Sequence, residues 1–90
     1  MSNFEELLNY NNSKAYKIFD FVIEKFPDKN RIESSRDLIQ HGEAPIALES
    51  LCENIIDYEI TLPANIYTEL VDVCRFFDVA EEYWKNILHE

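Results

Sequence analysis

The side chains with the most chemical potential in this sequence are carboxylates that repeat at helical spacing in its middle third. Glu49, Glu53 and Asp57 are four residues apart, so on a helix of about 3.6 residues per turn they form one ridge. Paired carboxylates perform acid–base catalysis where a pocket raises the pKa of one of them, whereas on an outward face they attract basic partners. The ridge lies away from the apolar stripe of its own segment, which favours the second role.

Charge is distributed unevenly along the chain. Six of the eight basic residues lie between Lys14 and Arg36, and none lies between Arg36 and Arg75. That second interval holds eight acids: Asp37, Glu43, Glu49, Glu53, Asp57, Glu59, Glu69 and Asp72. Each like-charge pair four residues apart costs a helix about 0.2–0.5 kcal/mol, so the arrangement is locally unfavourable.

Two interpretations of this acidic interval stay open. One is a solvated face that lysines and arginines of the earlier helices fold over and neutralise. The other is an uncompensated docking surface for a basic partner, with two tyrosines as amphipathic anchors. Its predicted residues are Glu43, Glu49, Glu53, Asp57, Tyr58, Glu59, Tyr67, Glu69 and Asp72. A surface of this kind mimics the anionic substrate of a nuclease or plugs its positive cleft.

Residue patterns for other chemistry are not found in the sequence. His41 and His89 have no second ligand at metal spacing, and there is no glycine-rich phosphate loop, Cys-x-x-Cys pair or nucleophile elbow. Ser34 and Ser35 are adjacent, with His41 too far along the chain to face them dependably. We therefore expect no enzyme, no metal site and no cofactor.

Length and composition predict one domain over residues 1–90, with enough apolar volume (47% of residues) for a packed core. The formal net charge of -10 repels phosphate backbones and anionic head groups, so neither nucleic acid nor membrane is an expected partner. Residues 1–26 lack the basic start and long apolar run of a signal peptide, which predicts a cytoplasmic protein. Cys52 and Cys74 lie in apolar stripes, which favours buried thiols over a disulfide.

The elements that must position the acidic ridge are helices. Apolar residues recur at helical spacing between the prolines and the glycine, which predicts an all-α fold, a single small antiparallel helical bundle of about five helices. The first helix ends before Pro27, and residues 11–13 predict two collinear pieces or one kinked helix. The second begins after a cap at Asp28 or Asn30 and stops at Gly42.

Three further helices are predicted in the C-terminal half. Pro45 fits the first turn of the third helix, which should end near Tyr58, and Pro63 opens the fourth. Asp78 and Glu81 resemble a capping box that begins a fifth helix, expected to carry apolar residues as far as residue 88.

A family resemblance is carried by several short runs. They are Leu38-Ile39-Gln40-His41-Gly42-Glu43, Ala47-Leu48-Glu49-Ser50-Leu51-Cys52-Glu53 and Ile60-Thr61-Leu62, followed by a helical pair ending in Tyr83-Trp84. Over residues 32–88 the chain resembles the MafI-type immunity proteins, small helical antitoxins encoded beside polymorphic toxins, including those of contact-dependent growth inhibition systems. The chain departs from the family pattern at Leu62 and Pro63, where a polar cap is more usual.

The resemblance implies a cytoplasmic protein that binds and neutralises the toxic C-terminal domain of a cognate toxin, commonly a nuclease. We expect the partner to be a basic nuclease domain, an RNase in the first instance, bound one to one by a chain that is monomeric when free. The alternative from another class is a non-catalytic helical adaptor that self-associates through an apolar patch around Tyr83, Trp84 and the second helix. These two aromatics are also interpretable as anchors of the last helix to the core.

Overall fold

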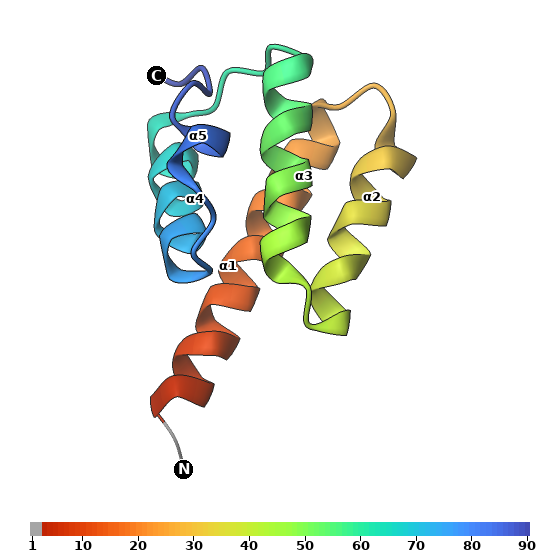
Figure 1. Cartoon of the computed structure of the whole chain (residues 1–90). Helices are drawn as coiled ribbons and strands as arrows, with labels where there is room; N and C mark the ends of the chain where they lie inside the picture. The colour runs from red at the N-terminus through yellow and green to blue at the C-terminus, as the bar shows by residue number, and fades with distance from the viewer. Residues whose placement is uncertain (1–2) are drawn as a thin grey trace.

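Helices form where apolar side chains repeat at helical spacing, and they end at or near the prolines and the glycine. The computed structural model describes residues 3–90. Within them lie five α-helices and one 3₁₀ turn: α1 (Asn3–Lys25), α2 (Lys29–Asp37), η1 (Leu38–His41), α3 (Ala44–Asp57), α4 (Ala64–Phe76) and α5 (Glu81–Trp84). The first four helices run in alternating directions (Figure 1). The predicted all-α bundle of about five helices is confirmed.

The core lies where the C-terminal half of α1 contacts α2, α3 and α4, with α2 and α5 packed against α3. Its largest fully buried side chains are Phe19, Ile18, Ile32, Leu48, Leu51, Ile55, Leu62 and Leu70. Cys52 and Cys74 are buried free thiols within this core, as predicted. Within residues 3–90, none of the helices combines the length and the apolar character needed to cross a membrane.

α1 is one continuous helix of 23 residues, so of the two alternatives predicted for residues 11–13 the one with two separate pieces is wrong. Asn11 is buried, and its side-chain amide donates to the Leu7 carbonyl at 2.9 Å, one helical turn back. A polar side chain that bonds within its own helix does not interrupt it. Because α1 stays continuous, its N-terminal turns project beyond the rest of the bundle (Figure 1).

The ends of the middle helices follow the predicted signals. Asp28 caps α2, because its carboxylate accepts the backbone N–H of Arg31 at 3.4 Å. Gly42 ends η1 in the left-handed conformation, with φ of 76°. Pro45 lies in the first turn of α3, and Tyr58 is the C-cap of that helix. These turns fix where α3, the helix with the acidic ridge, begins and ends.

Gly42→Ala should lower the free energy of unfolding by about 1 kcal/mol. A Cβ at this position would meet nothing within 4 Å, so the cost comes only from the left-handed backbone. Urea unfolding followed by circular dichroism measures the change. A variant as stable as the wild type would show that the turn relaxes to another conformation at no cost.

The C-terminal segment differs from the prediction. Asp78 has a φ of 59° and ends α4, so it does not form a capping box with Glu81; Ala80 is the N-cap of α5, without a side-chain hydrogen bond. α5 is only four residues long. The chain beyond it runs back to Leu62, whose N–H donates to Leu88 O at 2.9 Å and whose carbonyl accepts the N–H of Glu90 at 3.0 Å. These bonds hold the tail to the α3–α4 connection.

Candidate partner-binding surface

The predicted ridge of carboxylates on α3 is present in the structure. Glu53 and Asp57 are exposed and Glu49 is half-buried. Within residues 3–90, none of the three forms an ion pair within 4.0 Å with a lysine, arginine or histidine. We call Glu49, Glu53 and Asp57 the α3 ridge. Its negative potential is therefore offered to solvent or to a partner.

Arg31 on α2 is the basic residue that lines the ridge on one side. Its guanidinium donates to the Tyr58 hydroxyl at 3.4 Å and not to a carboxylate. A hollow of about 190 Å³ lies between the two helices here and is lined by Arg31, Ser50, Glu53, Asn54 and Asp57. Nothing in the sequence spacing indicated this arginine. Only the antiparallel pairing of α2 with α3 places it here.

Tyr83 on α5 borders the other side of the ridge. The carboxylate of Glu49, then burial, and then the carboxylate of Glu53 raise the pKa of Tyr83 above its usual value. A negatively charged tyrosinate is disfavoured beside negative carboxylates, so the shift reports the local potential. The ridge thus makes deprotonation of Tyr83 less favourable than for an isolated tyrosine.

Glu49→Gln should move the pKa of Tyr83 down toward its ordinary value of about 10, because the largest cause of the rise is removed. In the wild type, the stability contributed by neutral Tyr83 is present below the unfolded pKa and is lost as pH rises through the raised folded pKa. An NMR pH titration of the Tyr83 ring carbon measures the shift. Glu43→Gln, at the exposed start of the same helix, is the control. If the pKa of Tyr83 were the same in both variants, Glu49 would not be the cause of its rise.

The two α4 acids of the predicted surface do have counter-ions. Lys17 on α1 lies 3.2 Å from Glu69, and Lys14 lies 3.8 Å from Asp72. For Glu69 and Asp72 the expectation of uncompensated charge is therefore wrong, since α1 packs against α4 and brings its lysines there. Ion pairs with lysines are thus found at the two α4 acids, whereas among residues 3–90 the three α3 carboxylates have none.

The remaining predicted residues have mixed positions. Tyr58 is 40% exposed beside the ridge, with its ring 4.3 Å from that of Phe26. Tyr67 is half-buried, stacks on His89 at 3.7 Å and lies with its hydroxyl 3.4 Å from the Trp84 carbonyl, so it anchors the C-terminal tail. Glu43, the N-cap of α3, and Glu59, left-handed with φ of 52°, are exposed at the two ends of α3.

The patch expected for a self-associating adaptor is not formed around Trp84. This side chain is 7% exposed, and its indole N–H donates to the Val79 carbonyl at 3.3 Å. Tyr83 is half-buried against the core. Of the two interpretations of this pair, anchoring of the last helix is the one that the structure shows.

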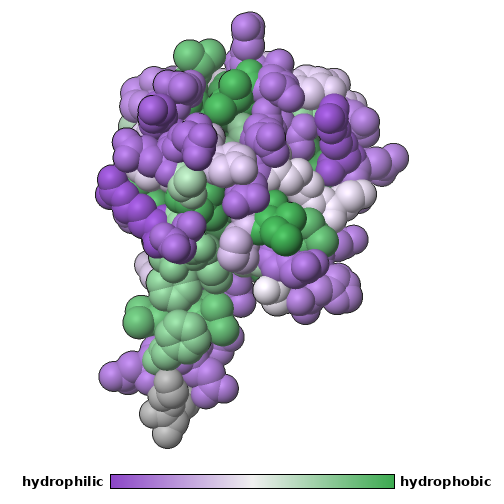
Figure 2. Space-filling model, in the orientation of Figure 1, coloured by the Kyte–Doolittle hydropathy of each residue, from purple (hydrophilic) through white to green (hydrophobic). Residues whose placement is uncertain are grey.

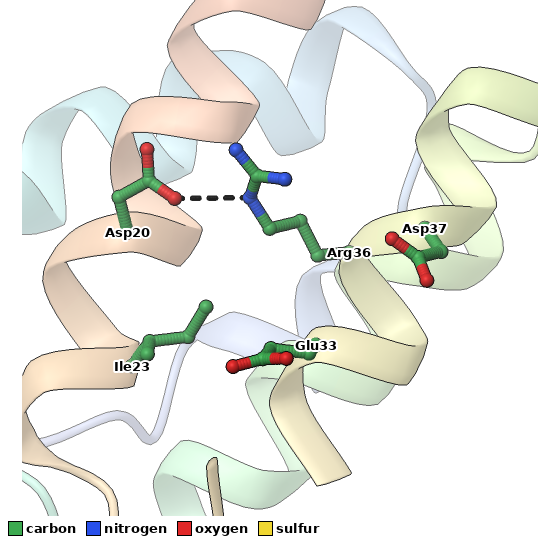
Figure 3. A pocket seen from close by; sticks show the side chains of 5 residues that line it. All are labelled: Asp20, Ile23, Glu33, Arg36 and Asp37. Carbon is green, nitrogen blue, oxygen red and sulfur yellow. Dashed lines mark hydrogen bonds and ion pairs between the residues drawn. The ribbon is translucent and has the colours of Figure 1, made fainter. Parts of the chain in front are cut away.

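A second hollow, of about 320 Å³, lies between α1 and α2 (Figure 3). Arg36 reaches across it from α2 and donates to Asp20 on α1 at 2.9 Å. Ile23, Glu33 and Asp37 complete the lining. The lining holds one arginine and three carboxylates, so this hollow also favours a cationic group over an anion.

The residues considered for other chemistry have structural contacts. The Ser35 hydroxyl lies 2.7 Å from that of Ser50 on α3, and the Ser34 hydroxyl donates to the Asn30 carbonyl within α2. A hydrogen bond with Cys74, and then burial, raise the pKa of the Cys52 thiol. Among residues 3–90, no three His, Cys, Asp or Glu side chains come together in a way that could hold a metal ion.

Comparison with protein-family models, with curated protein sequences and with solved structures gave no match for this chain. The resemblance of residues 32–88 to the MafI-type immunity proteins therefore stays a prediction. The functional interpretation of α3 depends on its charge, its exposure and its contacts.

Proposed function

We propose that the chain is an immunity protein, a cytoplasmic antitoxin that binds the toxic C-terminal domain of a cognate polymorphic or contact-dependent growth inhibition toxin. The toxin domain is basic and is expected to be an RNase. The antitoxin neutralises it by covering the positive active-site cleft with the α3 ridge. It acts as a monomer that forms a one-to-one complex, and it performs no catalysis itself.

The absence of ion pairs at Glu49, Glu53 and Asp57, among the residues from 3 to 90, is the observation that carries this proposal. The fold gains little from the ridge, since each like-charge pair costs about 0.2–0.5 kcal/mol. Lysines on α1 neutralise the acids of α4, so the chain does supply counter-ions elsewhere. The α3 ridge differs from the α4 acids in that its positive counter-charge would come from a partner protein.

A ridge of carboxylates is suited to a cleft that binds phosphates. RNase clefts carry lysines and arginines for the backbone of their substrate, and three carboxylates along about two turns of helix offer those cations an alternative. A folded helix that fills the cleft also excludes the substrate sterically. With a formal net charge of -10, the antitoxin itself repels the nucleic acid.

The proposal is tested by mixing the chain with the toxin domain encoded beside its gene and measuring cleavage of RNA. We expect activity to fall in proportion to added protein and to reach zero near one equivalent. Full activity at saturating protein would end the proposal. Light scattering at two concentrations separates it from the adaptor alternative, for which an oligomer unaffected by salt is expected.

A further inference from the structure

The hollow of about 190 Å³ between α2 and α3 adjoins the α3 ridge, and we call it the α2–α3 hollow. Four of its five lining residues come from α3. At about 100° per residue, Ser50, Glu53, Asn54 and Asp57 lie within an arc of about 100° around that helix. Figure 2 shows hydrophobic residues gathered on the projecting end of α1, whereas the surface where α2 begins and α3 ends is mostly hydrophilic. The hollow is therefore a polar site.

Asn54 is a buried polar residue of this lining that lacks a bonding partner. It is 5% exposed, yet its side-chain amide forms no hydrogen bond with any of residues 3–90. Its amide oxygen and nitrogen are not completely enclosed, so they reach solvent through the hollow that Asn54 lines. A buried amide without a partner is costly, and most such groups in proteins are satisfied by protein or water. The amide oxygen of Asn54 is thus an acceptor available to a donor placed in the hollow.

The other groups of the lining add acceptors and negative charge. Glu53 and Asp57 are exposed and form no ion pair within residues 3–90. The Ser50 hydroxyl lies 2.7 Å from that of Ser35, and its oxygen can accept a second donor. Arg31 donates to the Tyr58 hydroxyl and to neither carboxylate. Two negative charges and one positive charge therefore line the hollow, which favours a cation over an anion.

We propose that the α2–α3 hollow takes the guanidinium group of an arginine side chain of the partner protein. Its donors point in several directions in one plane, and they are met by the carboxylates of Glu53 and Asp57 and by the amide oxygen of Asn54. A guanidinium is less strongly hydrated than a lysine ammonium, so it enters a hollow beside Arg31 at lower cost. The volume equals about six water molecules at roughly 30 Å³ each, enough for this group. The inference rests on the proposed function for the identity of the partner.

The recognition itself is tested on the chain alone, by NMR titration of the labelled protein with N-acetyl-arginine methylamide. We expect a saturable shift of the Asn54 side-chain amide. Asn54→Ala should weaken binding about tenfold, followed at the backbone amides of Ser50 and Glu53, because a hydrogen bond to a charged group is lost. Asn65→Ala is the matched control, since Asn65 is an exposed asparagine of α4, and it should change the affinity by less than about twofold.

Three further probes identify the group that the hollow selects. The citrulline derivative has the same shape as the arginine probe but no charge, and we expect it to bind at least about tenfold more weakly. The lysine derivative should also bind more weakly, and inorganic phosphate should leave Asn54 unmoved. Equal binding of citrulline, tighter binding of lysine, a phosphate-induced shift at Asn54 or no saturable shift with arginine would each overturn the proposal. Circular dichroism checks folding, and Asp57→Asn, at an exposed position, replaces Asn54→Ala if that variant melts.

Failure of this inference is distinguishable from failure of the proposed function. If the toxin domain is inhibited in the RNA-cleavage assay but the arginine probe does not bind, the antitoxin proposal stands and the hollow has no part in it. If the probe binds at Asn54 but RNA cleavage continues at saturating protein, the antitoxin proposal fails. The hollow then remains an arginine site for another basic protein.

Discussion

Glu49→Lys combined with Glu53→Lys should slow association with the proposed basic toxin domain by about tenfold or more at low salt. The ridge forms no ion pair within residues 3–90, so reversing two of its three charges should replace attraction of a basic partner by repulsion. The dependence of the rate on ionic strength should flatten in the variant. Stopped-flow measurements at several salt concentrations give both quantities.

We expect the fold to tolerate this change. Glu53 is exposed and Glu49 half-buried, and a lysine at position 53 lies one turn from Asp57, which replaces a like-charge pair by an attractive one. The matched control is Glu24→Lys with Glu33→Lys, two exposed glutamates of α1 and α2. Both double variants change the net charge from -10 by four, to -6. Equal slowing in the two would mean that overall charge, and not the ridge, governs association.

Phe19→Ala lowers the free energy of unfolding by about 3–5 kcal/mol. Phe19 is fully buried in the core where α1 contacts the other helices, and it heads the group of large side chains with no exposed surface. A folded domain typically has a free energy of unfolding of roughly 5–15 kcal/mol, so the variant should be close to unfolding at ordinary temperature. The melting temperature should fall by well over 10 °C, because each kcal/mol lost lowers it by roughly 4–8 °C.

Phe4→Ala is the control for this prediction, since it makes the same substitution in the same helix. Phe4 is 64% exposed, so we expect a loss of less than about 1 kcal/mol. Urea unfolding of both variants and the wild type gives the comparison. Similar losses in the two would mean that the N-terminal end of α1 is as tightly packed as its second half.

Local signals sufficed to predict most of the helix boundaries. Gly42 supplies a left-handed turn and Pro45 fits a first helical turn whatever the tertiary structure, so the start of α3 is fixed by residues close in sequence. Asn11 was misleading because a polar residue that breaks a helix and one that bonds to its own helix look alike in a sequence. Asp78 was predicted to be the N-cap of the fifth helix, but it lies in a left-handed turn just after α4. The same residue type is common both after one helix and before the next, so the sequence does not distinguish the two.

The candidate site was only partly predictable for a different reason. Spacing placed Glu49, Glu53 and Asp57 on one ridge, because that follows from helical geometry alone. Which acids have counter-ions depends on which helices pack together, and the contact of α1 with α4 gave Glu69 and Asp72 their lysines. Two neighbours of the ridge, Arg31 and Tyr83, come from helices that spacing does not relate to α3.

The central claim, that the α3 ridge is the surface that binds a basic toxin domain, is tested most directly by NMR. Amide signals of the labelled chain are followed while the unlabelled toxin domain is added. We expect the largest shifts at Glu49, Glu53 and Asp57 and at their neighbour Tyr83, with little change along α4. Binding that leaves the α3 signals unmoved would contradict the claim.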